Sequence, residues 1–302
     1  QETVFPKNHY IHNMRITATI LLAVCICSAQ AQQIDKKLQS RIAEAVRGFN
    51  GTAGIYVHDL KHNKVAYINA DTIFPTASIV KIPILLGIMQ KIEAGELNYH
   101  QRLMYRDSLF YDEGDDILSR FKDSATIELS KVMMLMITIS DNCASLWLQA
   151  LAGSGTRINE IADSLGYTST RVNSRTAGRE ENRSIYGWGQ STPREIASIM
   201  KKIVRGEIFS KAASDKMLRL LSRQYWDEQA LSQIPAGVFV ADKTGAVDES
   251  RNEVMYVNGK KNPYIFSIFT KNNKDQSWDE NNEAWIMTKK ISALLWAYYN
   301  GK

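Results

Sequence analysis

Three short motifs carry the residue types needed to transfer an acyl group to a serine. They are Ser78–Lys81 (SIVK), Ser140–Asn142 (SDN) and Lys243–Gly245 (KTG), in that order along the chain. A serine hydroxyl is a poor nucleophile at neutral pH, so it needs a neighbouring base that takes its proton during attack on a carbonyl. Together the motifs predict an active-site serine with a proton relay and a cationic clamp for the substrate.

Lys81 is the candidate base for Ser78. The segment after Ser78 is apolar and predicts a helix that is entered from Phe74–Ala77 and ends near Gly95. Residues three apart share a helix face, so Lys81 reaches the serine oxygen. An ordinary lysine is protonated at pH 7, and the role therefore requires burial or a nearby cation such as Lys243 to lower its pKa. Unpaired N–H groups at the helix start would stabilise an oxyanion.

With these motifs in this order, the sequence resembles the penicillin-recognising serine hydrolases, and within them the class A β-lactamases and their relatives. The resemblance covers most of residues 33–302, and Ser191–Glu195 looks like the helix start that follows the family's Ω-shaped loop. It implies that Ser78 is the acylated nucleophile and Lys81 its proton partner. It also implies that Ser140 passes a proton to the leaving nitrogen.

The resemblance also implies which groups bind the substrate. Asn142 would hold the amide side chain, and Lys243 and Thr244 would bind the carboxylate. The backbone N–H groups of Ser78 and Ala246 would form the oxyanion hole. The substrate-binding set that the family pattern implies is therefore Asn142, Lys243, Thr244, Gly245 and Ala246.

One departure from the family pattern concerns release of the acyl group. Class A β-lactamases place a glutamate in the Ω-loop, a few residues after a Thr-Arg-hydrophobe-Asp/Asn stretch, where it activates the deacylating water. Here that stretch is Thr170–Asn173, and its register puts Thr176 or Ala177 at the glutamate position. Glu180 and Glu181 follow, but neither has an asparagine at the family's spacing. We therefore predict intact acylation and slow hydrolysis of the adduct.

Strand patterns occur near both ends of the chain, with a mostly helical middle between them. We predict an α/β fold with an antiparallel sheet flanked by helices and an inserted all-helical subdomain, as in β-lactamases and transpeptidases. The active site should lie at the seam, where Ser78 and Ser140 on the helical side face Lys243 on the sheet side. The expected bounds are 50–72 and 236–302 for the sheet region, about 83–225 for the helical subdomain, and Trp285–Tyr299 for a closing helix.

The first 31 residues read as a leader. From Met14 they show a positive start, a short apolar run and a small-x-small pattern at Ala29–Ala31, which predicts a signal peptide cleaved after Ala31, whereas residues 1–13 lack this character. The apolar run is too short for a stable membrane anchor, and the residue before Cys25 does not suit a lipoprotein signal. We expect 32–302 to be one exported domain, periplasmic or secreted.

Composition agrees with a globular enzyme. The chain has 302 residues, of which 44% are hydrophobic, so it can bury a sizeable core. Its net charge is +5; the leader contributes Lys7, Arg15 and Glu2, a net +1, which leaves +4. This charge is scattered and would mildly favour anionic substrates, and no basic stripe with interleaved aromatic residues indicates nucleic acid.

We predict no metal ion or other cofactor. His58 and His62 are four apart but read as a strand and a turn, so we expect surface histidines. Asp112–Asp116 lacks the alternating ligands of a calcium loop and reads as a solvated acidic run. Cys143, the single cysteine after the leader, precedes an apolar helix and is expected to be a core thiol.

Three functions share this acylation machinery. The first is an exported serine β-lactamase-like hydrolase that opens the β-lactam ring through a Ser78 acyl-enzyme. The second is a D,D-peptidase or esterase of related fold, and the third is a penicillin-binding sensor with slow deacylation. Family similarity favours the first, while the missing glutamate favours the others. Under each, the partner is a small β-lactam or peptidoglycan-type molecule, and we expect a monomer.

Overall fold

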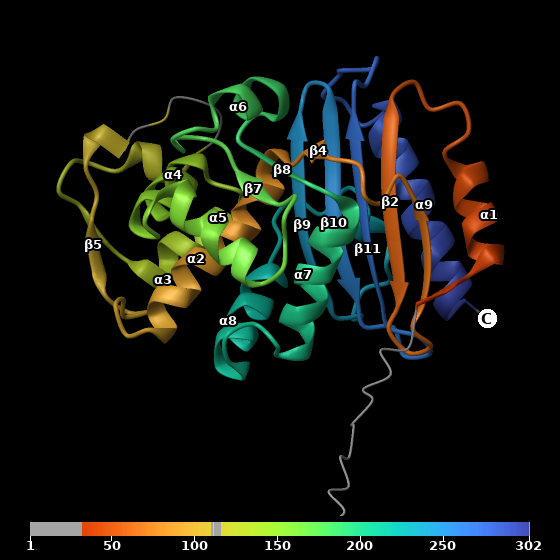
Figure 1. Cartoon of the computed structure of the whole chain (residues 1–302), viewed down its shortest axis with the longest axis horizontal. Helices are drawn as coiled ribbons and strands as arrows, with labels where there is room; N and C mark the ends of the chain where they lie inside the picture. The colour runs from red at the N-terminus through yellow and green to blue at the C-terminus, as the bar shows by residue number, and fades with distance from the viewer. Residues whose placement is uncertain (1–31, 110, 112–115, 302) are drawn as a thin grey trace, which may run out of the picture. The chain divides into compact units, whose positions relative to one another are not determined.

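The computed structural model describes residues 32–109, 111 and 116–301, and the predicted leader lies outside them. Its central element is a six-stranded sheet in the order β1-β3-β2-β11-β10-β9 (Figure 1). The strands are β1 (Gln33–Ile34), β2 (Thr52–Asp59), β3 (Lys64–Ile68), β9 (Val240–Val247), β10 (Ser250–Val257) and β11 (Tyr264–Lys271). The five long strands pair antiparallel, as predicted, whereas β1 pairs with β3 in parallel and makes the sheet mixed. A two-residue strand leaves no pattern in the sequence.

Two hydrophobic cores lie on opposite faces of this sheet. On β10, Val254 and Tyr256 join the core that continues into the helical subdomain, whereas Met255 and Val257 join the core under α1 and α9. The alternation arises because successive strand residues point to opposite faces. Burial on both faces explains why every residue of β10 is buried.

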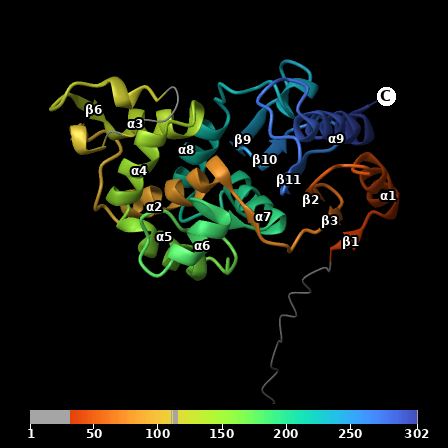
Figure 2. The same cartoon turned by 90° about the horizontal axis from the view of Figure 1, so that it is seen from above.

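Helices cover both faces of the sheet, as Figures 1 and 2 show. On one face, α1 (Lys36–Ala45) packs against β3 and against α9 (Glu283–Asn300), which confirms the expected closing helix. On the other face, α7 (Pro193–Arg205) packs against β2, β10 and β11. Its start has Thr192 as the N-cap, where the side chain accepts the Glu195 N–H, and Pro193 in the first turn.

The helical subdomain lies beyond the β9 edge of the sheet. Its helices are α2 (Lys81–Glu93), α3 (Leu129–Thr138), α4 (Asn142–Leu151), α5 (Ser154–Ser164) and α8 (Lys211–Leu221). The first nine residues of α2 are all buried, and the helix contacts the other four. A helix surrounded on all sides must be apolar nearly all round, as its sequence is. A short hairpin of β5 (Arg102–Met104) and β6 (Thr126–Glu128) leads into α3.

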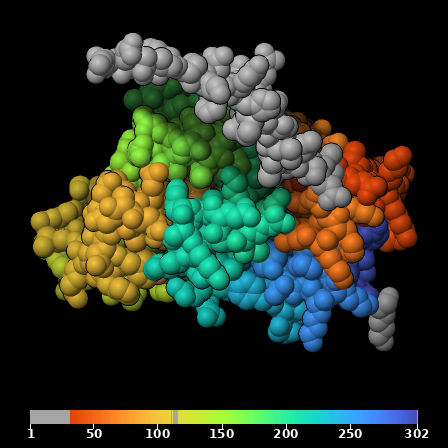
Figure 3. All heavy atoms as spheres, turned by 60° about the horizontal axis from the view of Figure 1, so that its bottom comes forward, coloured from red at the N-terminus to blue at the C-terminus, as the bar shows by residue number. Residues whose placement is uncertain are grey.

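A small three-stranded sheet connects the two parts. It has the order β4-β8-β7, and its strands are β4 (Phe74–Pro75), β7 (Arg171–Val172) and β8 (Gly189–Ser191). Between β7 and β8 the chain forms the Ω-loop, residues 173–188, which includes the short helix α6 (Glu180–Tyr186). From the side seen in Figure 3, the teal segment of α7 and α8 lies between mustard-coloured residues of the helical subdomain and the blue turn after β10.

The two histidines expected at the surface, His58 and His62, differ in exposure. His58 lies in β2 and is only 3% exposed, so its prediction as a surface histidine was wrong, whereas His62 is exposed in the turn as predicted. Strand β2 is covered on both faces. Its sequence includes polar residues, so its pattern did not reveal this double coverage. Within the described residues, no helix is both long and apolar enough to cross a membrane.

Candidate active site

Ser78 lies in a 3₁₀ turn, η1 (Ala77–Val80), that continues directly into α2. The predicted helix start is thus close to its observed place, with Lys81 as the first residue of α2. Ala77 has a φ of 45°, in the left-handed region that non-glycine residues rarely adopt. Such backbone strain is held where surrounding structure over-determines it, as here where η1 packs against β8, β9 and β10.

The four motif side chains form one continuous chain of hydrogen bonds. The ammonium of Lys81 lies 3.0 Å from Ser78 Oγ and 2.9 Å from Ser140 Oγ. The ammonium of Lys243 lies 3.2 Å from Ser140 Oγ on the other side. Lys81 also donates to Asn142 Oδ1 at 2.8 Å and to the backbone carbonyl of Ser140. Three segments far apart in sequence therefore meet at one point.

The environment of Lys81 suits a base. Its side chain is fully buried, and burial lowers the pKa well below that of an ordinary lysine, with the nearby charge of Lys243 lowering it further. The carboxylates of Asp116 and Asp141 oppose this shift. A neutral amine has a lone pair that can accept the Ser78 proton. The burial that the sequence analysis required for this role is therefore present.

Strand β9 presents the KTG motif to the nucleophile. Gly245 is needed there because an added Cβ would lie 2.6 Å from the carbonyl oxygen of Thr76 and 2.9 Å from the backbone nitrogen of Ser78. Only glycine permits this close approach of two backbones. The approach brings the end of β9, including Thr244 and Ala246, to the backbone N–H groups at the start of η1.

Lys243 and its neighbour Asp242 point to opposite faces of β9. Lys243 faces the helical subdomain, and Asp242 faces the α9 side together with Glu253 of β10. Burial lowers the pKa of Lys243 to about 8, and the two carboxyl groups oppose that shift. Burial raises the pKa of Glu253 to about 7, and burial together with the charge of Glu253 raises that of Asp242 well above its usual range.

The turn that carries Ser140 is held by side-chain caps. Ser140 has a φ of 65°, again in the left-handed region, and Asp141 is the N-cap of α4 through its contact with the Ala144 N–H at 2.7 Å. The second Asp141 oxygen accepts the Leu118 N–H at 3.0 Å. This arrangement fixes the SDN turn so that Ser140 and Asn142 both point at Lys81.

Asp116 was predicted to be solvated, and the structure contradicts this. It is 5% exposed, and its Oδ1 accepts the Asn142 N–H at 2.7 Å. Burial and the negative charge of Asp141 raise its pKa, while hydrogen bonds to backbone N–H groups lower it. The other residues of that acidic run lie outside the described residues. A composition-based interpretation of the run could not place its last residue beside a turn 26 residues away.

One group of metal-ligand side-chain types occurs within the described residues. The carboxyl oxygens of Asp116 and Asp141 and the sulfur of Cys143 lie within 4.8 Å of one another. Burial raises the pKa of the Cys143 thiol to about 11, so it stays protonated, and both Asp141 oxygens already accept backbone N–H groups. Thiol metal ligands are thiolates. The geometry therefore fits a structural cluster in which Cys143 is the predicted buried thiol.

Two cavities meet at Ser78. One, of about 640 Å³, lies toward α9 and is walled by Trp226, Trp278 and Trp285. There Arg251 contacts both Trp278 and Trp285, with its guanidinium carbon 4.4 Å and 4.9 Å from the two ring centres. The other cavity, of about 940 Å³, lies toward the Ω-loop and includes Trp188. The sequence analysis missed this aromatic lining, because its members come from separate segments.

The Ω-loop brings no carboxylate to the nucleophile. Thr176, at the predicted glutamate position, is buried against α5: its hydroxyl donates to the Ser174 carbonyl at 2.9 Å, and a Cβ added to Gly155 would lie 1.8 Å from that hydroxyl oxygen. Glu180 is exposed and accepts the Gly178 N–H. In the described part of the chain, no loop carboxylate hydrogen-bonds to Ser78, Lys81 or Ser140.

Comparison with known protein families shows the family to which the chain belongs. The model of the Beta-lactamase enzyme family matches residues 37–299, nearly the whole described chain. The chain belongs to this β-lactamase enzyme family. Its fold class is confirmed by the same likeness, and at the level of the family the protein is a β-lactamase-like hydrolase.

Two relatives within the β-lactamase family have low sequence identity to this chain, but the similarity extends over nearly the full length of both proteins. β-Lactamase VEB-1 from Pseudomonas aeruginosa is 22% identical over 298 residues, covering 95% of this chain and 97% of the relative. The extended-spectrum β-lactamase PER-1 from the same organism is also 22% identical, with 92% and 96% covered. A mutant of PBP-A, solved as an acyl-enzyme complex with penicillin G, is 25% identical with a TM-score of 0.78, covering 89% of this chain and 98% of that one.

Proposed function

We propose that this β-lactamase family member is an exported serine hydrolase that opens a β-lactam ring through an acyl-enzyme on Ser78. The observation that carries the proposal is the hydrogen-bonded chain Ser78–Lys81–Ser140–Lys243 around a fully buried lysine. A buried amine of lowered pKa next to a serine hydroxyl is the arrangement that activates a nucleophile at neutral pH.

In this mechanism, the neutral amine of Lys81 accepts the proton of Ser78 as Oγ attacks the lactam carbonyl carbon. The tetrahedral oxyanion is stabilised by the backbone N–H groups of Ser78 and Ala246. The proton then passes through Ser140 to the lactam nitrogen as the C–N bond breaks, which leaves Ser78 esterified and Lys81 neutral again. The two contacts of Ser140 Oγ, to Lys81 and to Lys243, support this relay.

Substrate orientation uses charge on one side and aromatic surface on the other. Lys243, with a pKa of about 8, is mostly protonated at neutral pH, so it pairs with the substrate carboxylate beside Thr244. Asn142 supports the substrate amide. The tryptophan-walled cavity offers flat apolar surface next to the thiazolidine or equivalent ring, since aromatic side chains provide large contact areas.

Release of the acyl group is slow in this account. Hydrolysis of the ester needs a water activated by a base, and the Ω-loop supplies no carboxylate at the nucleophile in the described chain. This same observation favours a second candidate function: a D,D-peptidase, esterase or penicillin-binding sensor that takes up the same acyl group. The likeness to PBP-A in its penicillin G acyl-enzyme complex agrees with efficient acylation under either function.

Export is part of the proposal, because it rests on the predicted signal peptide and cleavage after Ala31, which lie outside the described residues. A periplasmic or secreted monomer would meet β-lactams and peptidoglycan peptides where both occur. The resulting mature chain begins at Gln32, immediately before β1.

Labelling with a fluorescent penicillin tests the proposal. The mature protein should become covalently labelled within minutes, and Ser78→Ala should not; the matched variant Ser119→Ala, a serine in the same subdomain outside the motifs, should label normally. Labelling of Ser78→Ala would refute Ser78 as the nucleophile. Release of D-alanine from an acyl-D-Ala-D-Ala peptide, with little penicillin turnover, would favour the peptidase over the β-lactamase.

A further inference from the structure

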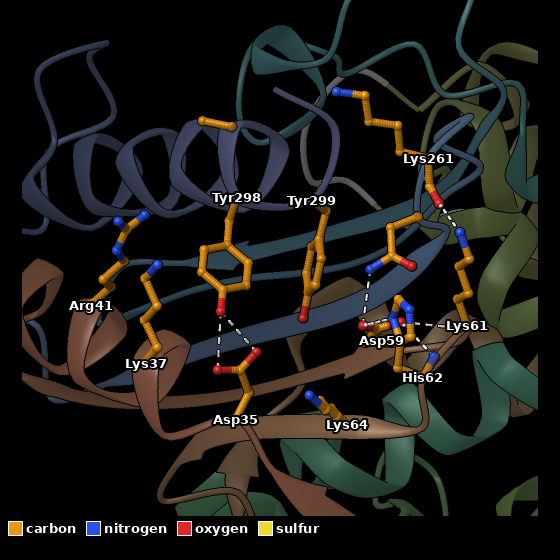
Figure 4. A pocket seen from close by; sticks show the side chains of 12 residues that line it. Asp35, Lys37, Arg41, Asp59, Lys61, His62, Lys64, Lys261, Tyr298 and Tyr299 are labelled. Atoms are coloured by element: carbon orange, nitrogen blue, oxygen red, sulfur yellow. Dashed lines mark hydrogen bonds and ion pairs between the residues drawn. The ribbon is translucent and has the colours of Figure 1, made fainter. Parts of the chain in front are cut away.

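A third cavity lies at the other edge of the main sheet. It has a volume of about 580 Å³ and is bounded by the start of α1, the β2–β3 turn, the β10–β11 turn and the end of α9 (Figure 4). In Figure 3 the orange β2–β3 turn adjoins the blue β10–β11 turn, and Lys61 Nζ donates to the Lys261 carbonyl across that junction at 3.1 Å. The active site borders β9, so the sheet separates the two sites.

The cavity is strongly cationic. Five lysine or arginine side chains line it against two carboxylates, a formal charge of +3 before any contribution from His62. The five are Lys37, Arg41, Lys61, Lys64 and Lys261. Within the described residues, the ammonium groups of Lys37 and Lys64 have neither a hydrogen-bond nor an ion-pair partner. These cations converge from three segments, namely α1, the β2–β3 turn with the start of β3, and the β10–β11 turn.

Both carboxylates accept hydrogen bonds from the protein itself. Asp35 caps α1 through the Leu38 N–H at 3.0 Å and accepts the Tyr298 hydroxyl at 2.9 Å. Asp59 is buried, which opposes ionisation, yet the hydrogen bonds it accepts from the His62 and Asn262 groups hold its pKa below the usual value. Within the described residues, neither acid pairs with Lys37 or Lys64, and these two lysines remain available to a ligand, whereas Lys61 and Lys261 donate to backbone carbonyls.

A buried hydroxyl is aimed into the same cavity without a partner. Tyr299 is 7% exposed, and its hydroxyl makes no hydrogen bond to the described residues. Figure 4 shows that hydroxyl pointing between Asp35 and Asp59, with Lys64 nearby. Burial, and then the charges of Asp59 and Asp35, raise the pKa of Tyr299, so the hydroxyl keeps its proton and can donate it to a ligand oxygen. An unpartnered buried donor is costly unless a ligand oxygen accepts from it.

We propose that this cavity binds a phosphate-bearing ligand, with Lys37 and Lys64 as charge partners and the Tyr299 hydroxyl as a hydrogen-bond donor. A multiply charged anion matches a site of net +3 better than a single carboxylate does, and lysine binds phosphate as a point charge. A soluble compound and a lipid head group both present the same phosphate oxygens, and the experiments below distinguish the two sources. The proposal is independent of the chemistry at Ser78.

Titration calorimetry with pyrophosphate at low ionic strength tests the site on the mature protein. We expect saturable one-to-one binding that weakens about 100-fold in Lys37→Ser/Lys64→Ser, because each lost charge-assisted contact costs about tenfold. The control variant Lys122→Ser/Lys211→Ser removes the same charge from exposed positions outside the cavity and should change the affinity less than twofold. Penicillin labelling of Ser78 should be unchanged in both variants.

Tyr299→Phe is the finer test. It removes only a hydroxyl that has no partner among the described residues, so thermal stability should be equal or higher, while pyrophosphate affinity should fall about fivefold. Vesicles that contain phosphatidic acid, compared with neutral phosphatidylcholine vesicles, distinguish the sources: cavity-dependent vesicle binding assigns a lipid head group, and pyrophosphate binding alone assigns a soluble ligand. Equal affinities in the cavity and control variants, or no saturable binding, would overturn the proposal.

Discussion

The seam and the Ω-loop, the two regions that border Ser78, differ in the catalytic side chains that they contain. At the seam, Ser140 joins Lys81 and Lys243 in a hydrogen-bonded chain, and both lysines are buried with lowered pKa values. In the Ω-loop, the sequence register puts Thr176 or Ala177 at the glutamate position, and the Thr176 hydroxyl binds its own loop while its side chain packs on α5. Under the proposed function, the seam would form the acyl-enzyme, whereas the loop would lack the group that hydrolyses it.

This contrast indicates that acylation and deacylation can be separated within one fold. The seam depends on three elements that converge on one lysine, so its geometry is set by the packing of α2, the SDN turn and β9. The loop is held by contacts such as Arg179 Nη2 to Gln190 at 2.8 Å and to Asn173 at 2.9 Å, and by hydrogen bonds between Ser174 and Gln149 of α4. Under the proposed function, a change in the loop should therefore alter turnover and leave acylation intact.

The largest expected effect comes from removing the base at the seam. Lys81→Met keeps the length and apolar stem of the side chain but should slow acylation by about 10³-fold, since general-base catalysis contributes on that order. The measurement is the second-order rate of penicillin adduct formation. Lys91→Met, on the same helix and outside the cavity, should acylate at the rate of the unmodified protein. An unchanged rate in Lys81→Met would exclude Lys81 as the base.

A smaller effect is expected when the carboxylate that opposes the Lys81 shift is removed. Asp116 raises the pKa of Lys81, so Asp116→Asn should lower it further and make the neutral amine available at lower pH. The acidic limb of the pH–acylation profile should therefore move to lower pH, and an asparagine oxygen can still accept the Asn142 N–H. Asp123→Asn, an exposed acid of the same subdomain, should leave the profile in place. A shift to higher pH would contradict the assignment.

The next prediction concerns stability at the sheet side of the seam. The folded protein holds the Glu253 proton up to a pKa of about 7, against a usual value of 4.5, so the free energy of unfolding should fall as pH rises through that window. Glu253→Gln keeps a neutral polar group at every pH and should raise Tm at pH 8 by about 5 °C, with little change at pH 4.5. Thermal denaturation at both pH values measures this; a Tm gain that is equal at both would refute the ionisation argument.

The smallest expected effect sharpens the account of the Ω-loop. Glu180 and Glu181 are exposed, and neither contacts the nucleophile in the described chain. The double variant Glu180→Gln/Glu181→Gln should therefore release the acyl group at the same rate as the unmodified protein, within about twofold. The rate of adduct loss after removal of free penicillin measures this. A tenfold slower release would show that a loop carboxylate activates the water after all.

The sequence predicted the seam well because its parts are encoded locally. Ser78 and Lys81 are three residues apart at a helix start, whereas the roles given to Ser140 and Lys243 came from the family resemblance. The alternating strands and the apolar α2 were likewise readable from periodicity. These features need only short-range rules, so their existence and order could be stated without coordinates.

Features that depend on convergence of distant segments were not predictable. Asp116 belongs to an acidic run but is buried beside Asn142, and the cavity tryptophans come from three separate stretches. The parallel pairing of β1 rests on two residues, and the burial of His58 depends on what covers β2 on both sides. In each case the outcome depends on tertiary contacts between segments far apart in the chain. Rules based on residue spacing within one segment contain no information about such contacts.

The most direct test of the central claim is the intact mass of the mature protein against time after mixing with a penicillin in excess. We predict that one adduct forms rapidly and persists for many minutes after free penicillin is removed, with little hydrolysed drug in solution. An adduct that clears within seconds while hydrolysed penicillin accumulates at many turnovers per protein would contradict the claim that the loop lacks a deacylating base.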